Sequence, residues 1–119
     1  MAARLRALNQ SRNTILVEGG WVANTAWTRL RGLLGHNPLQ PGEGLLLRGE
    51  KAIHTIGMGF AIDVLFLDRE GLVRHSIPAM APLRASPFIA AAADVLELPA
   101  GTIARTHTEL GDRIELEYS

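Results

Sequence analysis

Short apolar runs separated by clusters of turn-forming residues recur along this chain, and the pattern predicts a fold built mainly of β-strands. Near the start, the runs Leu5–Leu8 and Thr14–Val17 flank residues 9–13, a polar cluster that favours a turn. These two runs are therefore expected to form a hairpin. A further short strand is expected at Leu45–Leu47, which follows a segment containing prolines and glycines.

A second hairpin is predicted in the middle of the chain. Residues 60–67 are apolar on both faces except at Asp63, residues 68–71 form a turn that ends in glycine, and residues 72–77 continue as a strand. A strand that is apolar on both faces is usually covered on both sides. The first strand of this hairpin is therefore expected to lie centrally in the sheet.

The second half of the chain is expected to hold an irregular segment and two more strands. Residues 78–88 contain three prolines, which are expected to keep the segment out of regular structure. From Asp94 to Leu98 apolar and polar residues alternate, so we expect a strand there, although the alanines before it favour helix. In the last strand the pattern predicts three inward-facing side chains: Ile114, Leu116 and Tyr118.

Helical spacing is confined to two places. Trp27, Leu30 and Leu34 share one face of a predicted helix over residues 25–34, and Gly35 is suited to end it. A short helical turn is expected near residues 100–106, after Pro99. The predicted fold class is therefore α+β but mainly β: a compact barrel-like or sandwich-like sheet with one main helix and one short helical turn.

Composition limits the classes of function. A chain of 119 residues is expected to form a single domain, residues 1–119. Twelve basic side chains balance twelve acidic ones, which disfavours nucleic acid as a partner. No run is long enough to span a membrane, and charges interrupt the start of the chain where a signal peptide needs an apolar stretch, so we expect no membrane partner and a cytoplasmic location.

Several common catalytic and cofactor motifs are absent from the sequence. There is no phosphate-binding glycine loop, and no serine lies between glycines as in a nucleophile elbow. The chain has no cysteine, and its histidines, at positions 36, 54, 75 and 107, do not have the spacing that builds a metal site locally. We therefore expect no cofactor and no metal site formed within one segment.

The segment 52–63 carries the most informative polar residues. Met58 stands between two glycines, which suit a tight loop, and Asp63 interrupts an apolar strand. A buried carboxylate needs a cation or backbone donors, and the candidate cations are Arg29 and Arg105. In a functional interpretation His54 carries protons or binds a ligand, Met58 makes a soft contact and Asp63 orients the site.

A structural interpretation of the same residues is simpler, and we favour it. His54 then bonds a carbonyl group, Met58 fills a gap between strands, and Asp63 pins a turn or forms a structural ion pair. His107, which follows the predicted helical turn, is the other histidine that could approach His54.

Six short blocks in order resemble a widespread prokaryotic family, the domain of unknown function 192. They include Thr25–Gly35, which covers the predicted helix and its cap, Ile53–Met58, and Ile62–Asp68; the others are Gly42-Glu-Gly-Leu-Leu, Val95–Gly101 and Gly111-Asp112. The resemblance implies a compact, β-rich, barrel-like α+β domain and no established activity. Four candidate ligand-binding residues match the family pattern: Arg29, His54, Met58 and Asp63.

Two positions depart from that family pattern. Ala61 stands where a proline is common, and Glu50-Lys-Ala52 replaces a stretch that often holds cysteine or asparagine, which removes a possible metal ligand. Together these observations favour a non-catalytic binding or accessory module that recognises a small molecule or a protein in a cleft around His54–Asp63. The alternative is a small hydrolase or metal-assisted enzyme that uses His54 as acid-base group and Asp63 as its orienting partner.

Overall fold

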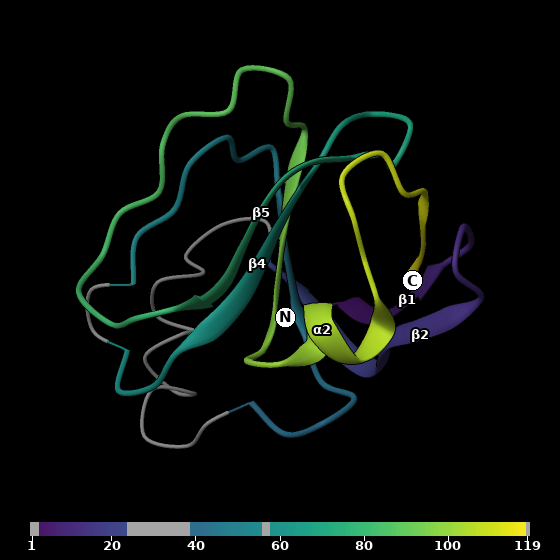
Figure 1. The fold of residues 1–119 in the computed structure, drawn as a ribbon, viewed down its shortest axis with the longest axis horizontal. Coiled ribbons are helices and arrows are strands. Elements are labelled where there is room, and N and C mark those ends of the chain that lie inside the picture. Colours follow the sequence, from purple (N-terminus) through teal and green to yellow (C-terminus); the bar gives the residue numbers. More distant parts are fainter. Residues whose placement is uncertain (1–2, 24–38, 56–57, 119) are drawn as a thin grey trace.

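A curled, barrel-like sheet of seven strands is the central element of the described part of the chain. The computed structural model describes residues 3–23, 39–55 and 58–118. Its elements are β1 (Ala3–Asn9), β2 (Thr14–Ala23), β3 (Leu45–Arg48), β4 (Ile62–Leu67), β5 (Val73–Met80), β6 (Asp94–Pro99), the helix α2 (Thr102–Thr106) and β7 (Ile114–Tyr118). The strand order is β5-β4-β6-β3-β2-β1-β7 (Figure 1).

The two ends of this sheet meet, which gives it its barrel-like form. Neighbouring strands are antiparallel except β2 and β3, which run parallel. An isolated bridge joins Leu72 to Arg113, and the Ile114 amide donates to the Gly71 carbonyl at 2.8 Å. The start of β5 is therefore held against the start of β7, at opposite ends of the strand order.

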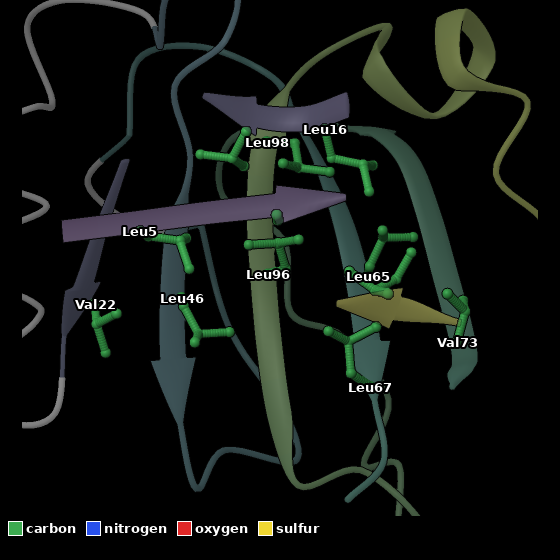
Figure 2. Packing of buried hydrophobic residues seen from close by; sticks show 12 residues of the cluster. Leu5, Leu16, Val22, Leu46, Leu65, Leu67, Val73, Leu96 and Leu98 are labelled. Atoms are coloured by element: carbon green, nitrogen blue, oxygen red, sulfur yellow. The ribbon is translucent and has the colours of Figure 1, made fainter. Parts of the chain in front are cut away.

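The core lies on both faces of the central strands. One cluster gathers side chains from β1 to β7, and Leu46, Leu96 and Leu65 belong to it (Figure 2). A second cluster, on the other face, includes Leu47 and Phe66 and is packed against residues from the loops 51–60 and 81–93. Because β4 is covered on both faces, all six of its residues are buried, as the apolar pattern predicts.

The main features predicted from sequence are confirmed. Both hairpins form, β3 and β6 are where the pattern places them, and α2 lies at the predicted helical turn near 100–106. The fold is mainly β and barrel-like; the described residues support the α+β class only loosely, since their one helix has five residues. The helix predicted over 25–34 lies outside the described residues.

Two local predictions were wrong. Residues 78–80 do not leave the sheet, because β5 continues to Met80. β5 is the end strand, and it contains one residue more than β4 between the pairs Ile62–Met80 and Val64–Ile77. Proline is tolerated in such an end strand and at such a bulge.

The second wrong prediction concerns Tyr118. It was expected to face inward but is 43% exposed, since it extends beyond the core and lies under Arg48, whose Cζ is 5.2 Å from the ring centre.

A buried polar network fastens the first hairpin to the loop after α2. The Asn9 side chain is fully buried and donates to Thr108 Oγ1 and Asp112 Oδ2, both at 3.0 Å. Arg12 Nε donates to the same Asp112 oxygen at 3.0 Å. Burial alone would raise the pKa of Asp112, but the hydrogen bonds from Asn9, Arg12 and the Glu109 amide outweigh it and lower that pKa.

This network predicts a pH-dependent contribution to stability. A carboxyl group whose pKa is lower in the folded state stabilises the fold above its unfolded pKa, and the contribution disappears as the pH falls through the folded pKa. Asp112→Asn should therefore cost about 2 kcal/mol at pH 7, from the lost hydrogen bonds. Urea unfolding should show this difference from wild type shrinking as the pH is lowered from 7 towards 2. A difference that stays constant over this range would contradict the assignment.

Candidate functional site

The segment that contains His54 is bound along its length to a second loop. The Thr55 amide donates to the Arg84 carbonyl, the Ser86 amide donates to the Ile53 carbonyl, and the Ile89 amide donates to the Lys51 carbonyl, each at 2.8 Å. His54 and Ala85 form an isolated antiparallel bridge. We refer to residues 51–55 and 81–89 together as the paired loops.

Thr55 fixes the turn of the second loop from inside. Its side chain is fully buried, and Oγ1 donates to the Ala81 carbonyl at 2.7 Å and accepts from the Arg84 amide at 2.8 Å. The Leu83 amide also donates to the Thr55 carbonyl, at 3.3 Å. One threonine thus bonds to both sides of the turn. The sequence does not predict this role, because nothing in the residues around Thr55 shows that its hydroxyl group bonds to a distant loop.

His54 and Met58 lie in different environments. The His54 side chain is exposed on the paired loops. Met58 is only 7% exposed and packs in the second core cluster, and its amide donates to the Thr55 carbonyl at 3.2 Å. Met58 therefore supports the loop from below, in agreement with the structural interpretation of this residue.

Asp63 is buried and engaged by two backbone amides. Its side chain is 1% exposed; Oδ1 accepts from the Ala79 amide at 2.8 Å and Oδ2 accepts from the Ile103 amide at 2.7 Å. Ala79 has a φ of 49°, in the left-handed region, at the bulge of β5. Asp63 therefore holds both the bulge and the first turn of α2 against β4.

Of the two kinds of partner predicted for Asp63, a cation or backbone donors, the structure shows backbone donors. Within the described ranges no ion pair joins Asp63 to Arg105, the cation considered from the sequence. The other candidate, Arg29, lies outside the described residues. Asp63 also points away from Met58, since its neighbours Ile62 and Val64 belong to the Met58 cluster and successive strand side chains alternate.

The residues proposed from sequence therefore do not all converge on one point. His107 is exposed at the C-terminal cap of α2, with a φ of 57°. In the part of the chain that the structure describes, no group of three or more histidine and acidic side chains is arranged to hold a metal ion. The surface of the paired loops, in contrast, is exposed to solvent and held in a defined conformation by hydrogen bonds.

Two large apolar side chains on the paired loops are exposed. Leu83 is 73% exposed and Phe88 is 69% exposed. Leu83 also has a φ of 61°, a conformation that costs a branched side chain about 1 kcal/mol or more. The prolines of residues 78–88 predicted only an irregular segment, with no role for these two side chains. The closely spaced Pro82 and Pro87 were the available signal that the apolar residues next to them, Leu83 and Phe88, would stay at the surface.

Comparison with known proteins identifies the family. The family model of domain of unknown function 192, described as Uncharacterized ACR, matches residues 7–116. The chain therefore belongs to this family, as the ordered sequence blocks indicated. A comparison with curated proteins found no match.

Solved structures with the same fold come from several bacteria. A Sinorhizobium meliloti protein, described as a candidate transcription regulator, is 27% identical over 97% of this chain and 93% of its own, with a TM-score of 0.74. A Novosphingobium aromaticivorans protein of unknown function is 19% identical over 96% and 84%, with a TM-score of 0.76.

A third neighbour is a much longer protein. It is a Burkholderia pseudomallei protein described as a candidate exported protein, 14% identical to this chain, with a TM-score of 0.56; the match covers 98% of this chain and 25% of that protein. Within the described residues, no helix is long and apolar enough to cross a membrane. The cytoplasmic location expected from the sequence stays a prediction.

Proposed function

We propose that this protein is a binding module without catalytic activity of its own, and that it recognises a protein partner through the paired loops. The observation that carries the proposal is the exposure of Leu83 and Phe88 on loops that are otherwise held by many hydrogen bonds. His54 lies on the same loops and is assigned to the contact surface. Arg29 is retained as a candidate contact on sequence grounds alone.

The shape of the surface favours a protein over a small molecule. Small ligands are held in hollows that cover most of their surface, whereas buried leucine, aromatic and arginine anchors dominate protein interfaces. Neither Leu83 nor Phe88 lines the larger hollows found among the described residues. They project from the surface, which suits insertion into an apolar pocket on a partner.

The order of the loops supports the same conclusion. A surface loop with no role can relax and turn its apolar side chains inward, but Thr55 and the loop-to-loop hydrogen bonds fix this one. Leu83 is held in a strained backbone conformation, and such strain is concentrated at functional sites. A surface that is ordered before binding loses less entropy when the partner docks.

The contacts of Asp63 weaken the enzymatic alternative. That alternative requires Asp63 to orient His54, whereas both Asp63 oxygens accept hydrogen bonds from backbone amides. In the binding module, Asp63 and Met58 have supporting roles: Asp63 fixes the bulge of β5 and Met58 packs beneath the loops. Among the described residues, His54, Leu83, Arg84 and Phe88 are the ones assigned to the partner contact.

The test compares partner capture by three forms of the protein in cells that contain it naturally. A photo-crosslinking residue at position 85, between the two apolar side chains, should trap the partner, whose affinity is then measured with purified proteins. The double variant Leu83→Ser, Phe88→Ser should bind about 30-fold more weakly, because each lost anchor is expected to be a major contributor. His54→Ala should produce a smaller loss.

Leu110→Ser is the matched control. Leu110 is also apolar and 63% exposed but lies outside the paired loops, so its replacement should leave the affinity unchanged. Equal binding by all three forms, or equal losses in the double variant and in Leu110→Ser, would show that the paired loops are not the contact surface.

A further inference from the structure

A hollow lies at one end of the barrel, and its lining residues do not include those assigned to the partner contact of the paired loops. It has a volume of about 760 Å³ and is framed by the end of β3, the end of β4, the start of β6 and the length of β7. Among the strands that the structure describes, β7 pairs only with β1, so beyond the Leu72–Arg113 bridge its other edge borders this hollow. Barrel mouths are common places for small ligands. We call this feature the end hollow.

The floor and one wall of the end hollow are apolar or aromatic. Ile114, a member of the first core cluster, and Leu116, which packs against that cluster, both line it. Leu67 of the same cluster, labelled in Figure 2, directly precedes the lining residue Asp68. Tyr118 lines it further along β7 and is 43% exposed. A flat apolar group placed here would contact these side chains and lose its exposure to water.

The acidic side chains at the end hollow are mostly neutralised by other contacts. Asp68 accepts from the Leu72 amide at 2.9 Å, the Glu70 amide at 3.0 Å and Arg74 at 3.2 Å. Asp94 accepts from the Gly49 amide at 3.2 Å, and its side chain is 17% exposed. Neither carboxylate is therefore open to a ligand cation.

The basic side chains at the end hollow are more accessible. Arg69 is exposed and makes no hydrogen bond or ion pair with any described residue. Arg48 is 47% exposed, and its contact with Asp94 is long, at 3.5 Å. An adjoining hollow of about 600 Å³ is lined by two further cations that are already engaged: Arg74 pairs with Asp68, and Lys51 Nζ donates to the Ala90 and Ala92 carbonyls. Against Arg48 and Arg69 stands the exposed Glu70, so the accessible charge is mainly positive.

We propose that the end hollow binds a small organic anion in which a carboxylate or phosphate is attached to a flat apolar body. Arg69 meets the anionic group, with Arg48 beside it, because a guanidinium can donate two parallel hydrogen bonds to either group. The apolar body lies on Leu116 and against the Tyr118 ring. The site needs no movement of the fold, since the described contacts already hold its walls apart.

The test is an NMR titration of the full chain with three probes that share one ring system. The probes are 1-naphthoate, 1-naphthyl phosphate and the neutral 1-naphthalenemethanol. Both anions should shift the amide signals of Gly49, Gly71 and Leu116, and the tighter of the two identifies the preferred anionic group. The neutral probe should bind at least about fivefold more weakly, since it lacks the charge-assisted contact.

Two variants and a control complete the design. Arg69→Gln should weaken binding of the tighter anion by about fivefold to tenfold, and Tyr118→Ala should weaken all three probes. Arg105→Gln, at an exposed arginine on α2 that does not line either hollow, should leave the affinity unchanged. Equal affinity for the neutral probe, unchanged binding by Arg69→Gln, or shifts confined to amides outside the end hollow would overturn the proposal.

Discussion

Asp63→Asn is expected to lower the free energy of unfolding by about 3 kcal/mol, because a buried donor left without an acceptor costs about 1 to 3 kcal/mol. The asparagine keeps one oxygen for one of the two amides, from Ala79 or Ile103, and presents an NH₂ group to the other. The carboxamide itself is then buried without a full set of partners. In a domain of this size the loss corresponds to a fall in Tm of about 12 °C.

Thermal unfolding followed by circular dichroism measures this loss, and Glu70→Gln is the control. Glu70 is exposed, so its replacement should change stability by less than about 0.5 kcal/mol. Below its melting temperature Asp63→Asn should still bind the partner of the paired loops, since Asp63 supports the fold and does not touch the ligand. An Asp63→Asn protein as stable as wild type, or one that is stable but inactive in binding, would refute the structural role.

Asp63 also shows which part of its environment can be predicted from the sequence and which part cannot. A carboxylate buried within an apolar strand needs hydrogen-bond donors to offset its desolvation, and this requirement can be predicted from the sequence alone. The identity of the donors is not, because the amides of Ala79 and Ile103 are 16 and 40 residues away along the chain. Only the β5 bulge and the position of α2, both set by long-range packing, bring them to the carboxylate.

The strands were more predictable than the loops for a related reason. Alternation and apolar runs report directly on which faces are buried, so the positions of β4 and β6 followed from local sequence. Pro78 was misjudged because proline is excluded from inner strands but tolerated in an end strand, and strand order is not a local property. The exposure of Phe88 was also not predicted, because an apolar residue is expected in the core and only the complete fold shows that no other segment covers this one.

The barrel closure supplies the second large expected effect, at Gly71. This glycine has a φ of 82°, and a Cβ added to it would lie 2.5 Å from the Ile114 carbonyl oxygen. That oxygen belongs to the backbone where β5 meets β7, so it cannot move away without separating the two strands. Gly71→Ala should therefore cost about 1 kcal/mol for the left-handed conformation and about 2 to 3 kcal/mol more for the steric conflict.

Gly49→Ala isolates the conformational part of this cost. Gly49 has a similar φ of 79°, but nothing lies within 4 Å of a Cβ at that position, so we expect a loss of only about 1 kcal/mol. Urea unfolding of the two variants gives the difference between them. Hydrogen exchange should also become faster at the Ile114 and Val73 amides in Gly71→Ala alone, because both donate across the closure. Equal losses in the two variants, with unchanged exchange at Ile114, would mean that the contact between Gly71 and Ile114 does not hold the barrel closed.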